Sequence, residues 1–349
     1  MSKIAIDCRM SDSGGIGTFL KSIVHEFVKD KDDAYLLIGD SEKLKEFEGD
    51  NVEILQCDIP IFSVKEMFSF PVKEINRCDL FFSPNYNLPG GIKVPVFSTI
   101  HDVIYLDLPQ LTSRVGRIIR KAFVSRALKK SKGIFTVSEF SKSRINHHFR
   151  RTPPLTVCYN GIKPMFAQAE SGLSKDGGYF LYLGNVKPHK GLPTLLEAYR
   201  MALAKGCDRR LVIVGEYNSF KTGAEDLLRA VDDKKDSITF TGKISDKDLL
   251  DVIINATALV QPSDYEGFGI PPLEAMSVGT PCIVSDIPVF KELYADFPVM
   301  FFPVNDAHAL SDLLLKDYPR VALDESHKNR YSYRTAAGII KNTIKNSMS

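Results

Sequence analysis

The residues with the clearest chemical potential lie in one short stretch, 265–274, which reads YEGFGIPPLE. It contains two carboxylates, Glu266 and Glu274, separated by seven residues. Carboxylate oxygens at a ligand site accept hydrogen bonds from hydroxyl groups. The alternative interpretation is that both glutamates are solvated beside a strand-to-helix turn, where the helix dipole favours a negative charge.

The residues around these glutamates predict an anion site. An apolar run at 258–260 is typical of a buried strand, and Pro271 and Pro272 suit the first turn of a helix, where a missing N–H costs nothing. The glycines of the stretch let a ligand approach the backbone closely. An anion at this helix start would be held by the backbone amides of Gly267, Phe268, Gly269 and Ile270.

A lysine elsewhere in the second half of the chain strengthens this interpretation. The apolar run 179–183 leads through Gly184 and Asn185 to Lys190, directly before a predicted helix. A lysine in this position can hold phosphate oxygens through its charge and its hydrogen bonds. In a doubly wound sheet, the turns after 183 and after 260 lie on the same carboxyl edge. We therefore expect Lys190 and Glu266 to converge on one diphosphate.

The first half of the chain supplies further candidates. His101 and Asp102 follow a predicted strand at 94–99, at the edge where ligands of open α/β sheets bind. The histidine is either structural or acts on a ligand, in which case Asp102 would orient or polarise it. Gly15 and Gly17 follow the first predicted strand and would let a sugar or phosphate approach. A nicotinamide fingerprint needs another glycine where the chain has Leu20, so that signal is incomplete.

Strands and helices alternate along the chain, which predicts an α/β protein with parallel, doubly wound sheets. A stretch without hydrophobic periodicity, 159–178, is typical of a linker, so we expect domains at 1–165 and 166–325. The segment 326–349 is expected to form a helix that returns to the first domain. The predicted strands are 3–7, 35–38, 52–55, 80–82, 94–99, 133–137, 155–158, 179–183, 211–214, 238–241, 258–260, 282–284 and 299–302.

Composition limits the class of protein. The chain has 349 residues, of which 44% are hydrophobic, and a net charge of +2. Its six cysteines form no C-x-x-C pair, which predicts reduced thiols and no metal cage. No apolar run reaches the length of a membrane span or a secretion signal. We therefore expect a cytoplasmic protein.

One region departs from this neutral balance. From Arg114 to Arg151 there are twelve basic residues and a single acidic one, Glu139. This basic patch is either a solvated helix face or a surface for an anionic membrane or a phosphate-linked acceptor, which would place the protein at the inner face of the membrane. Nucleic acid is disfavoured, because no aromatic residues interleave the charges and the whole chain is near neutral.

Taken together, these motifs resemble those of the retaining glycosyltransferases of family 4. The resemblance covers nearly the whole chain and implies the GT-B fold, in which two Rossmann-like domains face each other across a cleft. The matching residues are Gly14 to Gly17, His101 with Asp102, Val137 to Ser141, Tyr159 to Gly161, Gly184 with Lys190 and Gly191, Gly242 with Ser245 and Asp246, and Glu266 to Glu274.

The resemblance also implies roles for individual residues. Glu266 would contact hydroxyls of the donor sugar, Glu274 the nucleotide ribose, and Lys190 the diphosphate. His101 would contact the reacting sugar, and the backbone from Gly242 to Ile244 would meet the base. The N-terminal domain would take the acceptor and the C-terminal domain the nucleotide sugar.

The chain departs from the family pattern at two positions. Asn185 stands where many members have an arginine, so one cationic phosphate contact is absent or is supplied by Lys187 or His189. Tyr217 replaces a common glycine, which would narrow the pocket on that side.

A metal-binding D-x-D motif is not indicated by the acidic pair around Lys247. Ser245 is a good N-cap, and acidic residues in the next turn complement the helix dipole. We therefore expect an enzyme that needs no metal or other cofactor.

The loop 267–273 resembles that of mannosyl- and rhamnosyltransferases of bacterial surface-polysaccharide assembly, such as that of lipopolysaccharide. We accordingly predict transfer of a hexose, with GDP-mannose as the favoured donor, to a lipid-linked or growing polysaccharide acceptor. Two alternatives stay open. One is an epimerase or phosphorylase of the same fold, and the other is a non-catalytic scaffold that binds a nucleotide sugar.

Overall fold

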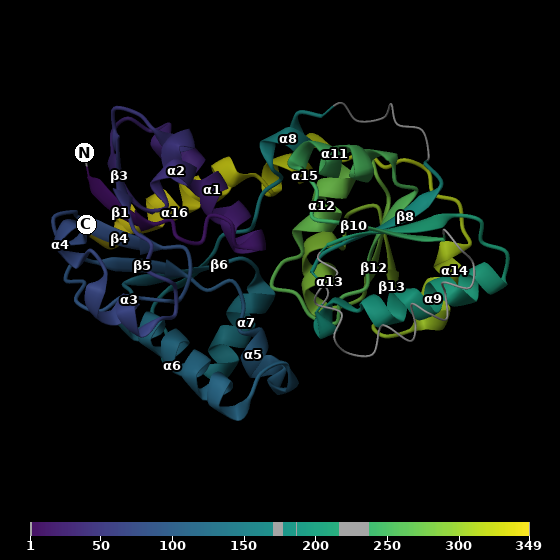
Figure 1. Ribbon diagram of the computed structural model, residues 1–349, viewed down its shortest axis with the longest axis horizontal. Helices are drawn as coiled ribbons and strands as arrows, with labels where there is room; N and C mark the ends of the chain where they lie inside the picture. The colour runs from purple at the N-terminus through teal and green to yellow at the C-terminus, as the bar shows by residue number, and fades with distance from the viewer. Residues whose placement is uncertain (1, 170–176, 186, 216–236, 349) are drawn as a thin grey trace. The chain divides into compact units, whose positions relative to one another are not determined.

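The structure is a computed structural model that describes residues 2–169, 177–185, 187–215 and 237–348. The chain forms two compact units, Met1–Gly161 with Arg330–Ser349, and Ile162–Asn329 (Figure 1). The division therefore lies four residues before the boundary expected from the linker composition. Each unit has a parallel sheet of its own.

Over the described residues, the sheet of the first unit has seven parallel strands in the order β3-β2-β1-β4-β5-β6-β7. Their continuous apolar runs fit strands that are covered on both faces. All the strands predicted for the first half are confirmed. They are β1 Lys3–Asp7, β2 Ala34–Gly39, β3 Val52–Gln56, β4 Leu80–Ser83, β5 Val96–Thr99, β6 Gly133–Thr136 and β7 Leu155–Val157.

Helices follow most strands of this unit. Serine side chains accept amide hydrogen bonds at three helix starts, Ser63 at α3, Ser113 at α6 and Ser138 at α7, as expected of N-caps. The helices are α1 Gly14–Val28, α2 Ser41–Leu44, α3 Val64–Ser69, α4 Val72–Ile75, α5 Ile104–Asp107, α6 Arg114–Lys130 and α7 Glu139–His148, with 3₁₀ turns at Lys45–Phe47 and Pro109–Leu111.

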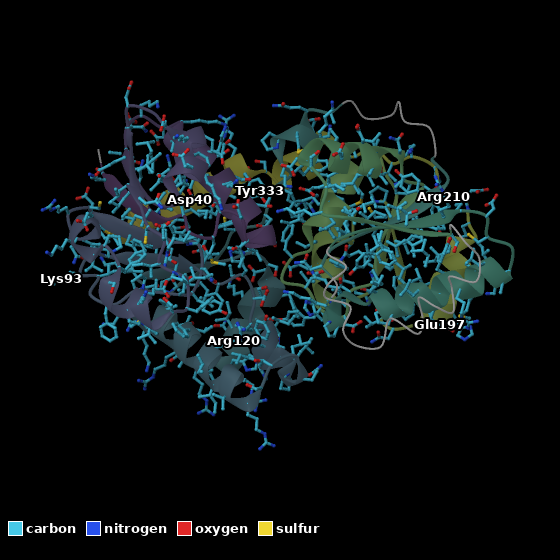
Figure 2. All side chains as sticks on the ribbon, in the orientation of Figure 1. Asp40, Lys93, Arg120, Glu197, Arg210 and Tyr333 are labelled. Atoms are coloured by element: carbon cyan, nitrogen blue, oxygen red, sulfur yellow. The ribbon has the colours of Figure 1, made fainter. Side chains whose placement is uncertain are left out.

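The predicted C-terminal helix is wrong in one respect, because two helices form, α15 (Glu325–Arg330) and α16 (Tyr333–Met348). Tyr331 between them is buried, with its ring centroid 5.5 Å from that of Tyr159. The Thr335 amide then donates to Ser332 Oγ at 3.1 Å, a side-chain cap that starts the second helix. Figure 1 shows α16 among the elements of the first unit, and Figure 2 labels Tyr333 at its start.

Helix α16 is part of the hydrophobic core of the first unit. Ile340 and Ile344 are buried in the same cluster as Phe27 of α1. Lys341 adds an ion pair, with Nζ 2.8 Å from Asp30 Oδ2. The last helix of the chain therefore stabilises the unit that contains the first strand.

The sheet of the second unit has six parallel strands over the described residues, in the order β10-β9-β8-β11-β12-β13. All the strands predicted here are also confirmed. The strands are β8 Tyr179–Leu183, β9 Arg210–Val214, β10 Ile238–Gly242, β11 Ala258–Gln261, β12 Cys282–Ser285 and β13 Val299–Phe302. The helices are α8 Pro164–Ala167, α9 Leu192–Ala204, α11 Asp246–Asn255, α12 Ile270–Ser277, α13 Pro288–Tyr294 and α14 Ala307–Leu314, with a 3₁₀ turn at Pro188–Lys190.

Both sheets have the strand order of a doubly wound fold, which confirms the predicted fold class. The chain starts in the middle of each sheet, and its direction of progress reverses between β1 and β4 in the first unit and between β8 and β11 in the second. The loops that leave these strands at their carboxyl ends separate at the reversal and form the usual ligand crevice. The loops after β8 and β11 carry Lys190 and Glu266.

Membrane-spanning helices and the cysteines were the two other subjects of the sequence-based expectations. Among the described residues, no helix is both long and apolar enough to cross a membrane. All six cysteines are free thiols, and Cys207 alone is not fully buried.

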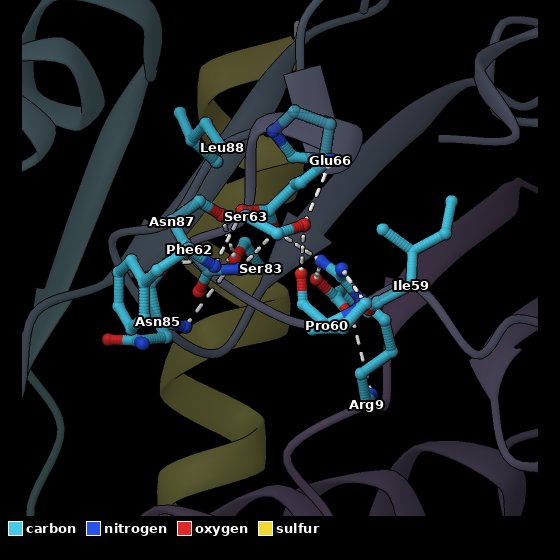
Figure 3. Close-up of polar contacts among 12 residues, drawn as sticks. Arg9, Ile59, Pro60, Phe62, Ser63, Glu66, Ser83, Asn85, Asn87 and Leu88 are labelled. Carbon is cyan, nitrogen blue, oxygen red and sulfur yellow. Dashed lines mark hydrogen bonds and ion pairs between the residues drawn. The ribbon is translucent and has the colours of Figure 1, made fainter. Parts of the chain in front are cut away.

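A buried ionic network lies at the reversal point of the first sheet (Figure 3). Arg9, just after β1, donates to Asp7 Oδ2 at 2.6 Å, to Glu66 Oε1 at 2.5 Å and to the Ile59 carbonyl at 2.9 Å. Glu66 also accepts from Asn87 Nδ2 at 2.7 Å. The network ties the end of β1 to the segment before α3, and the sequence motifs did not indicate it.

Asp248, in the first turn of α11, is held by a local cap. The Asp248 amide donates to Ser245 Oγ at 3.2 Å, and the Ser245 hydroxyl donates to Asp248 Oδ2 at 2.6 Å. The predicted N-cap is therefore confirmed.

Replacing Ser245 with alanine is expected to lower the free energy of unfolding by about 1 kcal/mol, because an amide of the first helical turn loses its acceptor. Denaturant unfolding of the purified protein measures this change. Asparagine at the same position also caps helices and should retain most of the stability. A Ser245→Ala protein as stable as the parent would show that the cap contributes nothing.

Candidate functional site

The two side chains predicted to converge are in direct contact in the second unit. Lys190, at the end of the 3₁₀ turn Pro188–Lys190, places Nζ 2.7 Å from each carboxylate oxygen of Glu266. The side chains are 23% and 9% exposed, so the pair is at the surface of the crevice and not sealed inside. The contact joins the loops after β8 and β11 across 76 positions of sequence.

The neighbours of Glu266 leave one of its oxygens, Oε2, able to accept a further hydrogen bond. Oε1 accepts from Ser263 Oγ at 2.8 Å and from Gln261 Nε2 at 3.3 Å, in addition to Lys190. Among the described residues, Lys190 alone donates a hydrogen bond to Oε2. An ammonium group has three N–H donors, of which two are used here. The pair can therefore accept a hydroxyl at Oε2 and donate to an anion from Nζ at the same time.

Glycines allow these two loops to lie so close together. Gly191 has φ of +68°, and a Cβ atom on it would be 1.8 Å from the Pro262 carbonyl oxygen. Gly269 has φ of +89°, and its Cβ would be 2.3 Å from the Phe290 ring. Neither position accommodates a side chain. The backbone joins the loops as well, because the Asp264 amide donates to the His189 carbonyl at 2.9 Å.

Glu274 lies on α12 and has different partners. Its side chain is buried, and its Oε1 is 3.8 Å from Lys163 Nζ. Burial raises the pKa of this carboxyl from 4.5 to about 7, against the opposing effect of Lys163. No hydrogen bond from the described residues reaches Oε1. A buried acceptor of this kind is suited to a ligand that brings hydroxyl donors.

Lys163 is a site residue that the motifs missed. Its Nζ lies between Glu274 Oε1, at 3.8 Å, and Asp246 Oδ1, at 3.9 Å. The available signal was its position two residues after the matching Tyr159 to Gly161 segment.

The other predicted donor-binding residues also follow carboxyl ends of strands in the second unit. Gly242 ends β10 with φ of +69°, and Ile244 lies in the turn before α11. Asn185 is exposed in the loop after β8. The segment Gly267 to Ile270 follows β11, and the Tyr294 hydroxyl donates to the Gly269 carbonyl at 2.6 Å.

His189 is one suggested substitute for the missing arginine. Burial, together with the neighbouring Lys190 charge, lowers the pKa of His189 to about 4. The ring is therefore neutral at pH 7 before a ligand binds, and only a bound anion beside it would favour its charged form. Lys187 is exposed on the same loop and keeps that role open. Tyr217, the second departure from the family pattern, lies outside the described residues.

His101 and Asp102 lie in the first unit. The His101 ring packs edge-on against Phe19, with centroids 5.0 Å apart, and Nε2 is 2.9 Å from the Pro84 carbonyl oxygen. A carbonyl only accepts, so Nε2 carries the hydrogen. Burial lowers the pKa of the ring to about 4, which keeps it neutral. Asp102 Oδ1 accepts the Ile104 amide at 3.1 Å, at the start of α5.

The predicted glycines of the first unit lie in the first turn of α1. A Cβ on Gly17 would be 2.4 Å from the Ser11 carbonyl oxygen, so this position needs glycine for the loop after β1 to pack on the helix. Gly15 precedes it in the same turn. The close packing explains Gly17 without a ligand, while its place after the carboxyl end of β1 also fits a ligand crevice.

Comparison with known families accounts for most of the chain. Residues 13–165 match the model "Glycosyltransferase Family 4", and residues 166–333 match "Glycosyl transferases group 1".

Two curated relatives share substantial identity with the chain. O-antigen chain mannosyltransferase B of Escherichia coli is 29% identical over 247 residues, which cover 68% of this chain and 64% of that protein. O-antigen chain mannosyltransferase RfbU of Salmonella typhimurium is 32% identical over 197 residues, 56% of this chain and 53% of that one. The matched region therefore spans less than two thirds of the length of either relative.

Solved structures resemble the chain over nearly its whole length. HepE of Anabaena, in complex with UDP and glucose, has a TM-score of 0.70 at 15% identity and covers 99% of this chain and 100% of its own. Sucrose-phosphate synthase of Thermosynechococcus elongatus has a TM-score of 0.74 at 16% identity, with 99% of each chain covered. At this identity the likeness concerns the fold. With both halves matched in order, the chain belongs to the glycosyltransferases of family 4 and has the GT-B fold.

Proposed function

We propose that the protein transfers a hexose from GDP-mannose to a lipid-linked or growing polysaccharide acceptor, with retention of the anomeric configuration. The observation that carries the proposal is the Lys190–Glu266 pair at the β8/β11 reversal point, which offers a cation and a hydroxyl acceptor side by side. A nucleotide sugar presents a diphosphate next to sugar hydroxyls. The diphosphate would pair with the Lys190 cation, and a hydroxyl with the Glu266 carboxylate.

The choice of mannose rests on the relatives. The two O-antigen relatives are named as mannosyltransferases. A third, named GDP-mannose:cellobiosyl-diphosphopolyprenol alpha-mannosyltransferase, from Xanthomonas campestris, is 33% identical over 141 residues, 40% of this chain and 36% of that protein. These names support both the donor and a lipid-linked acceptor.

In the proposed complex, Lys190 holds the diphosphate through its remaining N–H, and Glu266 Oε2 accepts a hydroxyl of the sugar. Glu274, with its buried Oε1, accepts from the ribose hydroxyls, and the turn at Gly242 to Ile244 lies against the base. The start of α12 adds the favourable end of a helix dipole to the diphosphate. His101 contributes a neutral ring from the first unit to the reacting sugar.

The chemical step is departure of the nucleoside diphosphate, followed by attack of an acceptor hydroxyl on the same face of the sugar. The bond from the anomeric carbon to the diphosphate oxygen breaks, the bond to the acceptor oxygen forms, and the hydroxyl proton passes to an oxygen of the departing diphosphate. Negative charge grows on the leaving diphosphate, so a cation already in place at Lys190 stabilises the transition state. Glu266 and Glu274 act as hydroxyl acceptors in this scheme and not as a nucleophile and acid pair. We propose that no metal takes part, since Asp248 of the D-x-D sequence is engaged by its helix cap.

A panel of nucleotide sugars tests the proposal. The purified protein is incubated with GDP-mannose, UDP-glucose, UDP-galactose and dTDP-rhamnose, with and without an undecaprenyl diphosphate-linked oligosaccharide, in the presence of EDTA. We expect acceptor-dependent turnover with GDP-mannose, and an α-mannosidic product by NMR. Turnover with a UDP-sugar alone would refute the donor, and loss of activity in EDTA would refute metal independence.

The same assay separates the alternatives. An epimerase would convert the donor without an acceptor, and a scaffold would bind it without turnover. The Glu266→Gln variant should keep its fold and lose most turnover if the protein is a transferase. Unchanged function of Glu266→Gln in cells would favour the scaffold.

A further inference from the structure

Exposed apolar side chains are concentrated in one part of the first unit. Eight large apolar side chains are exposed among the described residues, and six of them belong to α3, to α6 or to the loop before α3. Phe68 and Val64, one turn apart on α3, are 85% and 77% exposed. The six are Phe62, Val64, Phe68, Val115, Ile118 and Ile119.

Helix α6 is apolar on two faces. Its inner face buries Val124, Ala127 and Leu128. Val115, Ile118 and Ile119, at spacings of three and four residues, are exposed and form an outer stripe. A surface helix needs only one apolar stripe to pack on its own core. The outer stripe therefore has no role in the packing of this unit.

The exposed residues of α3 and α6 form one surface. The rings of Phe62 and Phe123 are 5.4 Å apart, which joins the loop before α3 to the middle of α6. Arg126 of α6 also donates to the Leu88 carbonyl, at 3.2 Å. We call this the α3–α6 surface, and it comprises the six exposed apolar residues together with Lys65, Arg114, Arg117 and Lys121.

The three α6 cations of the α3–α6 surface have no acidic partner within the described part of the chain. Among the described residues, Arg114, Arg117 and Lys121 make no ion pair, and α6 contains no acidic residue. The carboxylate of α3, Glu66, is buried against Arg9. The surface therefore combines exposed apolar groups with uncompensated positive charge.

Several arginines of the basic patch expected from the sequence have structural contacts, so only part of that patch is open to a partner. Arg120, labelled in Figure 2, stacks over the Tyr105 ring at 3.8 Å. Arg126 donates to the Leu88 and Pro89 carbonyls, and Arg144 pairs with Asp107 at 2.6 Å. These arginines hold the fold together. Near the outer apolar stripe of α6, Arg114 and Lys121 are exposed and Arg117 is half-buried.

The backbone at the edge of this surface is held in a strained conformation. Phe62 has φ of +58°, which is uncommon for a residue with a side chain. Its amide donates to Glu66 Oε2 at 2.9 Å, within the Arg9 network of Figure 3. A buried network that keeps an exposed phenylalanine in a strained position is costly, and such strain gathers at functional surfaces.

We propose that the α3–α6 surface docks on an anionic phospholipid bilayer. The apolar side chains would enter the headgroup boundary, and the cations beside them would pair with lipid phosphates. A second copy of the chain fits less well, because it would place like charges opposite each other. This binding goes beyond glycosyl transfer and does not depend on which donor the protein uses.

Vesicle flotation with the full chain tests the proposal, without any nucleotide sugar. One set of vesicles contains phosphatidylcholine alone. The other contains phosphatidylcholine with about 30% phosphatidylglycerol, which gives it the negative surface charge of an anionic membrane. We expect binding only to the anionic vesicles, and strong weakening in high salt. Arg114→Gln with Lys121→Gln should reduce partitioning roughly thirtyfold, and Phe68→Ser with Ile118→Ser by about tenfold or more.

Matched variants control for charge and apolarity. Arg150→Gln with Arg151→Gln removes two exposed cations outside the surface, and Leu315→Ser with Met348→Ser removes two exposed apolar groups elsewhere. Both pairs should bind like the parent, and circular dichroism should show all variants folded. Equal loss in the control pairs, equal binding to uncharged vesicles, or no vesicle binding would overturn the proposal. So would self-association in sedimentation that only Phe68→Ser with Ile118→Ser abolishes.

Discussion

Replacing Lys190 with methionine is expected to lower kcat/KM for the nucleotide sugar by about two to three orders of magnitude. Methionine keeps the length of the side chain and removes the charge. The departing diphosphate then loses its preorganised cation, and Glu266 loses the partner 2.7 Å from each of its oxygens. Steady-state kinetics with the donor at fixed acceptor concentration measure the effect. Circular dichroism verifies that the variant is folded.

The matched control is Lys316→Met, in the second unit but outside the site. Lys316 is exposed, so the variant removes the same charge without breaking the pair with Glu266. We expect a change of less than about fivefold, as for a solvated charge. Equal losses for the two variants would mean that Lys190 acts through the net charge of the unit and not through a specific contact with the donor.

Replacing Glu274 with glutamine is expected to stabilise the protein at high pH and to weaken its affinity for the nucleotide. The carboxyl group is buried, and its pKa in the folded protein is about 7, against an ordinary value of 4.5. A pKa raised by folding gives stability that is complete below pH 4.5 and is lost as the pH rises through 7. The loss amounts to about 3 kcal/mol at pH 8.

Denaturant unfolding of the parent and of Glu274→Gln at pH 5 and pH 8 checks this prediction. Glutamine does not titrate, so the parent should lose about 2–3 kcal/mol relative to the variant between the two pH values. Calorimetry should show a loss of roughly tenfold to a hundredfold in nucleotide affinity, because a neutral amide replaces a charged acceptor. A stability difference that does not change with pH would contradict the raised pKa.

The nucleotide measurement separates two roles of Glu274. If the variant gains stability at pH 8 and binds nucleotide as well as the parent, the buried carboxyl is a cost of the fold without a role in binding. If it gains stability and loses affinity, the protein retains an unfavourable buried charge for its ligand. The second outcome is expected, because Oε1 has no hydrogen bond from the described residues.

Most of the fold could be predicted from local patterns. Parallel strands buried on both faces leave continuous apolar runs, so β1 to β13 could all be found from short windows. The helix caps at Ser113, Ser138 and Ser245 are equally local. The C-terminal helix was wrong in its continuity, because the break at Tyr331 depends on a ring contact with Tyr159, far away in the chain.

The part of the site that lies on the loops after sheet strands could be predicted from the sequence. The strand order of a doubly wound sheet brings the loops after β8 and β11 to one crevice, which is why the sequence alone predicts the pairing of Lys190 and Glu266. Lys163 could not be placed beside Glu274 in this way, since it lies before the first strand of its unit and approaches through α8.

The stretch 265–274 and Lys190 carry their chemistry in residue type and spacing, and those features need no coordinates. The pKa of Glu274 and the neutrality of His189 depend on burial, a sum over neighbours from many parts of the chain. The outer stripe of α6 shows the same limit. Periodicity identifies apolar faces, yet both faces of α6 are apolar, and only packing against the rest of its unit determines that Val124 is buried and Ile118 is exposed.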